Sequence, residues 1–306
     1  MLNLIKLSQL KKSKPTFLIL IVILTFFNSY SQNQINLDVD NDLYFNRDFY
    51  YSSGIFLSLI KPYKNENQTR YNTYKIGQLI YTPSMRYESN PLKYDYPYSG
   101  YLFLEYQSKR KISEKSSFSI GGQIGVTGDP SLARGMQNLY HDLVLNLPNL
   151  KWEAQLPKET HLNVLGSFYN GFKLDEKVNL ITNFYTRIGT YQIMSGLNMG
   201  ILIGDLSWLN FNEGIMNDNN SKSSLFIGTS QELYFFDYKL EGSLFNDDAP
   251  LVMPSEKYRN QIELGIKTTF KNFQILTTYN TMSKETLKQR TSRHPFLKIS
   301  LTFLLN

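Results

Sequence analysis

The chain has 306 residues, 14% of them aromatic, no cysteine and a formal charge of +6. Without cysteine it can form neither disulfides nor thiolate metal sites, and it has no cysteine nucleophile. Four lysines and no acid lie within residues 1–31, so removal of that segment lowers the formal charge to +2. The basic charge therefore gives no reason to expect nucleic-acid binding.

Residues 1–31 are expected to form a secretory signal peptide. A basic start is followed by the apolar run "TFLILIVILTFF" and by the small residues Ser29 and Ser31. The run is too short to cross a bilayer, which needs ~20 apolar residues. We expect cleavage before Gln32, with an uncleaved anchor as the alternative, and a single domain over residues 32–306. Because no cysteine follows the apolar run, a bacterial lipoprotein is excluded.

The remainder of the chain shows repeated stretches in which apolar and polar residues alternate, which is the pattern of β-strands. In "SFSIGGQIGV", for example, Phe118, Ile120 and Ile124 share one face of the strand and Ser119 and Gln123 the other. Twelve such stretches are predicted, at 34–44, 50–61, 72–82, 97–108, 116–127, 160–172, 177–189, 192–205, 223–246, 258–270, 273–283 and 295–305. The ninth is kept whole because "YFFDY" contains no Gly, Pro or Asn to make a hairpin turn.

The predicted fold is all-β, a twelve-stranded antiparallel transmembrane β-barrel of the bacterial outer membrane. A soluble β-sandwich is the alternative, since both folds alternate apolar and polar faces. Three features favour the barrel: most stretches are longer than the ~5–6 residues usual in soluble strands, a secretory signal precedes them, and the last ends close to the C-terminus. The even count places both termini in the periplasm. Among the outside connections we place 45–49, 83–96, 128–159 and 206–222.

The connection at 128–159 contains the predicted helix "LARGMQNLYHDLVLNLP", with Asp129 as its N-cap and Pro130 as its first residue. Gln137 and His141 are four residues apart and share one face of this helix. Connections of this length inside compact domains are usually functional. An imidazole with a pKa near ~6.5 can accept a proton from water at neutral pH.

Further polar residues lie at the same end of the predicted barrel. Asn41 and Asp42 end the first strand, and Ser52 opens the second. Their carboxylate and amide oxygens are ligands that suit Ca²⁺. Ser52 is expected to form hydrogen bonds rather than to act as a nucleophile, because the chain has no G-x-S-x-G motif. The other two histidines, His161 and His294, start strands and are expected to be structural.

The run "NDLYF…RDFYYSSG…QLIYTPS…DYPYSGYL…GDPSLARGMQNLYH…QLPKE" resembles the outer-membrane lipid A 3-O-deacylases over about residues 36–160. The resemblance implies a twelve-stranded barrel that hydrolyses the 3-linked acyl ester of lipid A with Ca²⁺. Residue by residue it implies a site of Asn41, Asp42, Ser52, Gln137 and His141. In that site His141 is the general base, and the metal lies near Asn41 and Asp42.

One position departs from the family pattern, because Glu88 stands where some members have a lysine. Either Arg86 or Lys93 is therefore expected to contact the lipid phosphate instead, or the substrate preference is expected to differ. The implied partner is lipid A of lipopolysaccharide in the outer leaflet, with no nucleic acid, and we expect a monomer. Two alternatives remain: a phospholipase-like acyl hydrolase of the outer membrane, and a non-enzymatic barrel such as a pore or an adhesin.

Overall fold

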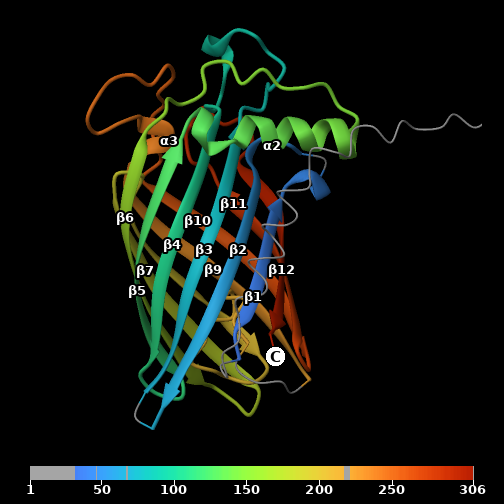
Figure 1. Cartoon of the computed structure of the whole chain (residues 1–306), viewed down its shortest axis with the longest axis vertical. Helices are drawn as coiled ribbons and strands as arrows, with labels where there is room; N and C mark the ends of the chain where they lie inside the picture. The colour runs from blue at the N-terminus through green and yellow to red at the C-terminus, as the bar shows by residue number, and fades with distance from the viewer. Residues whose placement is uncertain (1–31, 46, 67, 217–220, 306) are drawn as a thin grey trace, which may run out of the picture. The chain divides into compact units, whose positions relative to one another are not determined.

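The structure is a computed structural model that describes residues 32–45, 47–66, 68–216 and 221–305, so the expected signal peptide lies outside the described residues. Twelve antiparallel strands form a closed barrel in which each strand pairs with its neighbours in the sequence and β1 pairs with β12 (Figure 1). The strands are Gln34–Asn41 (β1), Tyr50–Asn65 (β2), Gln68–Thr82 (β3), Ser99–Lys111 (β4), Ser116–Thr127 (β5), Thr160–Lys173 (β6), Val178–Gly189 (β7), Gln192–Ile203 (β8), Lys222–Asp237 (β9), Tyr258–Phe270 (β10), Phe273–Ser283 (β11) and Arg293–Leu304 (β12). The predicted fold class and strand number are confirmed.

The alternation in the sequence separates an apolar outer wall from a polar interior. On β5 the side chains of Phe118, Ile120 and Ile124 are exposed, whereas those of Ser119 and Gln123 are buried. Exposed apolar residues on long strands suit contact with lipid. Among the described residues, no helix has both the length and the apolar composition needed to cross a membrane.

The ninth strand is shorter than predicted and ends at Asp237. Residues Tyr238–Glu241 form one helical turn (α3), whose Tyr238 and Leu240 are fully buried. The chain turns inward here because Asp237 is fixed inside the barrel by an ion pair of 2.7 Å with Arg259. This ion pair joins residues 22 positions apart, and the local sequence "YFFDY" does not predict it.

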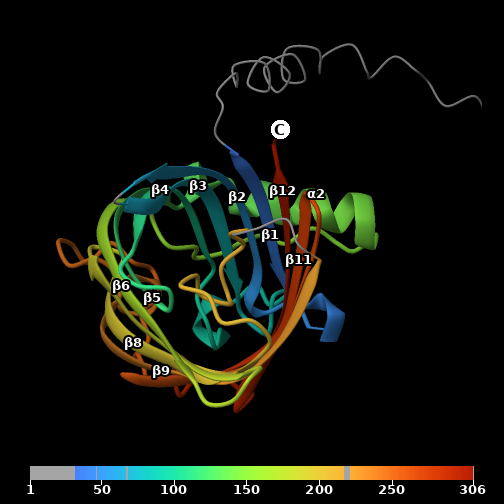
Figure 2. The ribbon, with the colours of Figure 1, turned by 90° about the horizontal axis from the view of Figure 1, so that it is seen from below.

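The connection from β8 to β9 lies at the rim opposite the helix, not outside as the sequence analysis placed it. Successive connections of an up-and-down barrel alternate between its two rims, so this one shares a rim with the β2–β3 turn. Its described residues 204–216 run into the lumen, as the view from below shows (Figure 2). There Trp208 stacks on Tyr71 with 5.3 Å between ring centroids, and Met216 O accepts a 2.7 Å hydrogen bond from Gln34.

The rim that carries the helix is filled by a buried ion network. Lys239 Nζ lies 2.6 Å from Glu285, and Arg259 lies 2.7 Å from Asp237 and 3.0 Å from Glu285. All four side chains are buried. Charges inside a protein are tolerated when each is paired and hydrogen-bonded. Packed side chains therefore occupy the lumen near both rims.

The long β5–β6 connection forms helix α2, Ala133–Tyr140, followed by a wider helical turn over His141–Leu145. Asp129 is not the N-cap. It lies inside a short 3₁₀ turn capped by Gly128, and α2 itself begins after Leu132, whose φ of 60° bends the chain. The start of α2 lies against β4 at Gly100, where a Cβ atom would come within 2.3 Å of Ala133 Cβ.

Candidate active site

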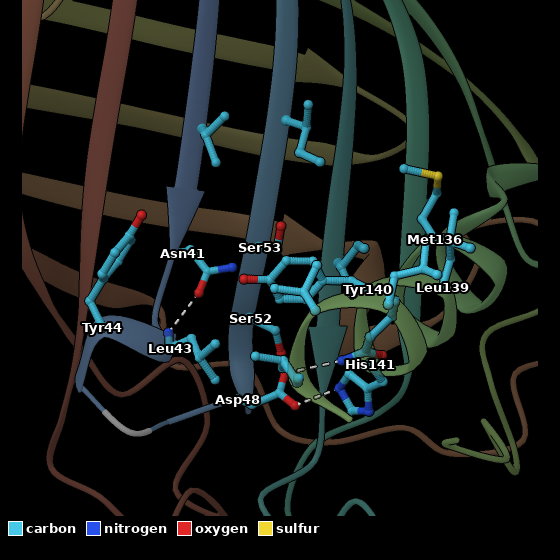
Figure 3. Close-up of a pocket in the computed structure, with 17 residues that line it drawn as sticks. Asn41, Leu43, Tyr44, Asp48, Ser52, Ser53, Met136, Leu139, Tyr140 and His141 are labelled. Carbon is cyan, nitrogen blue, oxygen red and sulfur yellow. Dashed lines mark hydrogen bonds and ion pairs between the residues drawn. The ribbon is translucent and has the colours of Figure 1, made fainter. Parts of the chain in front are cut away.

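A pocket of about 390 Å³ lies between α2 and the outer wall of strands β1 to β3 (Figure 3). Its polar end is formed by Asn41, Asp48, Ser52, Gln137 and His141. The rest of its lining is mostly apolar. These remaining residues are Val39, Leu43, Tyr44, Ser53, Ile55, Ile80, Met136, Leu139, Tyr140, Leu143, Val144 and Leu145. Pockets with apolar walls and a few convergent polar groups are typical of small-molecule sites.

The strands bring Asn41 and Ser52 to the polar end. Asn41 is the last residue of β1 and pairs with Ser53 of β2. Its Oδ1 accepts a 2.7 Å hydrogen bond from the Leu43 backbone. The β2–β3 register shifts between Tyr51 and Ser53, which leaves Ser52 in a bulge. Bulges re-aim side chains, and the Ser52 hydroxyl lies 2.7 Å from that of Thr82.

His141 lies at the end of α2 and is almost completely buried, with 1% of its surface exposed. Its Nε2 is 3.0 Å from Asp48 Oδ2, and its Nδ1 is 3.2 Å from the carbonyl oxygen of Pro148. Both ring nitrogens therefore face acceptor oxygens. The hydrogen bond to Asp48 raises the pKa of His141 above its ordinary value, against the opposing effect of burial.

Gln137 lies one turn before His141 and contacts the same carboxylate. Its Nε2 donates a 3.1 Å hydrogen bond to Asp48 Oδ1, and its Oε1 accepts one of 2.9 Å from the indole N–H of Trp152. An indole can only donate. Trp152 therefore fixes the amide orientation, with the oxygen toward the indole and the NH₂ group toward Asp48.

Asp48 joins these groups, although the sequence analysis did not single it out. Besides His141 and Gln137, it meets Arg86, whose Nε is 3.3 Å from Oδ2 and whose Nη1 donates to the Asp48 carbonyl at 3.1 Å. Only 7% of Asp48 is exposed. The motif "RDFYYSSG" contains Asp48, but nothing in its spacing marks this acid as a partner of residues 86, 137 and 141.

The remaining predicted residues do not line the pocket. Asp42 is buried beside it, where its Oδ2 accepts a 3.0 Å hydrogen bond from Phe49 N and lies 3.4 Å from His294. Lys93 forms a 2.9 Å ion pair with Glu88 on the exposed β3–β4 connection. Of the seven predicted residues, four line the pocket. Arg86 lies at its edge through Asp48, Asp42 is buried beside it, and Lys93 lies on the β3–β4 connection without lining it.

The metal prediction rests on Asn41 and Asp42. No group of three or more His, Cys, Asp or Glu side chains within the described part of the chain is arranged to hold a metal ion. Asp42 Oδ1, however, is buried and has no hydrogen-bond partner among the described residues. A buried carboxylate oxygen of this kind is costly unless something pairs with it. Together with the Asn41 amide it offers the hard oxygens that Ca²⁺ prefers.

A closed barrel with a lipid-facing outer wall and a pocket on that wall defines the class: a β-barrel protein of the outer membrane. The chain belongs to the LpxR family, since the family model described as "Outer membrane protein LpxR" matches residues 17–305. Family membership suggests a lipid A deacylase.

Comparison with the solved structure of one family member supports the same fold. LpxR from Salmonella typhimurium superposes with a TM-score of 0.75 at 16% identity, over 89% of this chain and 100% of that one. The beta domain of the Bordetella autotransporter Brka gives a TM-score of 0.48 at 7% identity, over 90% of this chain and 99% of that one. No curated protein sequence matches the chain.

Proposed function

We propose that the protein hydrolyses the 3-linked acyl ester of lipid A in the outer leaflet, with His141 as the general base that activates water. The observation that carries this proposal is the pocket: an imidazole and a carboxylate lie at one end of an otherwise apolar cavity, on the wall that faces lipid. An acyl ester joins a polar carbonyl to an apolar chain. A cavity divided in the same way suits such a substrate.

The residues at the polar end have separate roles in this reaction. His141 takes the proton of the attacking water, which is general base catalysis. The Asn41 amide and the Ser52 hydroxyl would hydrogen-bond the reacting ester in this mechanism, since donors at the developing negative charge stabilise the transition state. Gln137 positions the base through Asp48. The acyl chain would follow the apolar lining from Met136 to Leu145 on the helical side.

Asn41 and Asp42 are the residues that would hold Ca²⁺, and the unpartnered Asp42 oxygen supports this. Bound Ca²⁺ supplies electrostatic stabilisation to the oxyanion, worth several kcal/mol. We infer that the activity depends on this ion. Chelation should abolish hydrolysis and added Ca²⁺ should restore it; hydrolysis that persists in chelator would exclude the requirement.

Arg86 and Lys93 remain our candidates for contact with the lipid phosphate. Lys93 is the more accessible, with 59% of its side chain exposed, and its partner Glu88 is half-buried. Surface ion pairs of this kind contribute little and exchange readily. Arg86 would have to leave Asp48 to bind a phosphate, so we expect Lys93 to make the first contact.

The pocket and the lumen also bear on two alternative functions. An acyl hydrolase acting on glycerophospholipids would use the same pocket and the same chemistry. A pore needs an open lumen, whereas the Trp208 segment and the Asp237–Arg259 network fill this one near both rims. The filled lumen favours the two hydrolase functions over the pore.

Mass spectrometry of the lipids from cells with and without the protein tests the proposal. We expect lipid A to lose one hydroxyacyl chain in the presence of the wild-type protein and to remain intact with His141→Ala. A change confined to phospholipids would favour the other hydrolase. Unchanged lipids in both fractions would exclude either enzyme.

A further inference from the structure

In the structure, the contact between Asp48 and His141 leaves the imidazole of His141 unable to act as a base. Pro148 O can only accept, so the nitrogen facing it, Nδ1, carries a proton. The other nitrogen, Nε2, faces Asp48 Oδ2 at 3.0 Å. Gln137 donates to Oδ1 of the same carboxylate, and the Arg86 guanidinium forms an ion pair with its Oδ2. At this distance a hydrogen lies between Nε2 and Oδ2, so Nε2 has no free lone pair to accept a proton from water.

Loss of the Nε2 proton changes this contact. The Nε2 lone pair and the lone pairs of Oδ2 then face each other with no hydrogen between them, and they repel. A water molecule that donates one hydrogen to each acceptor restores both hydrogen bonds. Such a water can reach the pair, because both residues line the pocket. Its own lone pairs would remain free to attack an ester.

We propose that Asp48 and His141 together hold the attacking water, with His141 Nε2 accepting its proton and Asp48 Oδ2 fixing its orientation. The proposal rests on the hydrolase function given above. In the reaction the water oxygen bonds to the ester carbonyl carbon while its proton moves to Nε2. The bond from that carbon to the sugar oxygen then breaks, and the proton passes from Nε2 to the leaving alkoxide. The products are a fatty acid and a sugar hydroxyl.

The groups that surround the imidazole determine what each substitution of Asp48 would do to the base. The charged groups that face it are Asp48, from the β1–β2 connection, and Arg86, from the β3–β4 connection. Asparagine at position 48 has only one acceptor oxygen. Gln137, oriented by Trp152, must donate to that oxygen, so the new amide NH₂ would point at Nε2 and donate to it. Asp48→Asn would thus block the base, whereas Asp48→Ala would leave it open to water.

This difference predicts an unusual order of activities. We expect kcat of Asp48→Asn to fall about 10²- to 10⁴-fold, the range of general base catalysis, with KM little changed. Asp48→Ala should lose less, because water can still reach Nε2. A residue needed only for folding would show the opposite order, since Asn has the shape of Asp. Asp142→Asn is the matched control: this exposed acid follows His141 on the same helical segment.

The experiment measures fatty acid release from lipid A by the purified full-length protein in detergent, and the titration of His141 by NMR. Only three histidines occur in the chain, so histidine-selective labelling with His141→Gln as the assignment standard resolves them. We expect the His141 titration to move to lower pH in both Asp48 variants and not in Asp142→Asn. An unmoved titration, or an Asp48→Asn variant as active as Asp48→Ala, overturns the proposal. No release by the wild-type protein overturns the hydrolase function instead, whatever the titration shows.

Discussion

At the scale of single residues, the site depends on how hydrogen-bond donors and acceptors are matched. Trp152 can only donate, so it fixes Gln137, and Gln137 in turn meets Asp48. Pro148 and Asp48 determine which protons His141 carries. The helical spacing predicted that Gln137 and His141 share a face. It could not predict Asp48, because that acid comes from a connection 93 residues away in the chain.

The first residue-scale prediction concerns pH. The pKa of His141 is raised by Asp48, and the imidazole acts as a base only when it is neutral. Activity should therefore rise with pH through a midpoint above 6.5, the ordinary value for histidine. The pH profile of kcat/KM measures this midpoint. A midpoint at or below 6.5 would contradict the assigned base.

The second residue-scale prediction concerns Trp152, whose Phe variant loses the donor that orients Gln137. One hydrogen bond contributes about 0.5–1.5 kcal/mol, so kcat/KM should fall by up to about tenfold. In an Asp48→Ala background the same substitution should have little further effect, because the carboxylate to which Gln137 donates is then absent. Trp208→Phe, at the opposite rim, is the control. Fully additive losses would show that Trp152 acts independently of Asp48.

At the scale of elements, the alternation of apolar and polar residues predicted most strands correctly. It gave wrong boundaries where tertiary contacts determine the course of the chain. The ninth strand was overextended because "YFFDY" contains no Gly, Pro or Asn to mark a turn, whereas the buried residues Asp237 and Leu240 turn the chain inward. The helix was found in the right connection, but its start was wrong. A left-handed Leu132, rather than a cap at Asp129, begins α2.

The element-scale prediction concerns the seating of α2 on β4. A valine at Gly100 would clash with Ser131 and Ala133, whose atoms lie 2.2 and 2.3 Å from an added Cβ. The helix should shift, and displacement of a catalytic group by about 1 Å can reduce activity about 10²-fold. Gly122→Val is the control, because its Cβ would meet only Asn163 O at 3.9 Å. Lipid A hydrolysis and the folded fraction of each variant are measured together, and equal activities would exclude this role for Gly100.

At the scale of the whole molecule, the sequence predicted the class and number of strands because a barrel in lipid requires an apolar outer face on every strand. It did not predict what fills the lumen. The Trp208 segment was placed at the wrong rim, since a single error in the order of the connections moves a loop across the membrane. The interior contact of Trp208 with Tyr71 joins residues 137 positions apart, and no local sequence pattern predicts it.

The prediction at this scale concerns the buried ion network. Arg259→Met leaves Asp237 and Glu285 facing Lys239 alone. Breaking a buried ion pair from one side costs about 3–5 kcal/mol, so urea unfolding in lipid vesicles should shift to lower denaturant. Lys257→Met removes an exposed ion pair with Glu241 and should have little effect. If the two variants unfold alike, the network does not stabilise the barrel.

The central claim is that this barrel cleaves an acyl ester of lipid A with His141 as its base. Its most direct test is the release of a 3-linked hydroxy fatty acid from purified lipid A by the purified protein with Ca²⁺. We predict release by the wild-type protein and at least a ~10²-fold slower release by His141→Ala, in keeping with general base catalysis. Equal release by both proteins, or none by the wild type, would contradict the account.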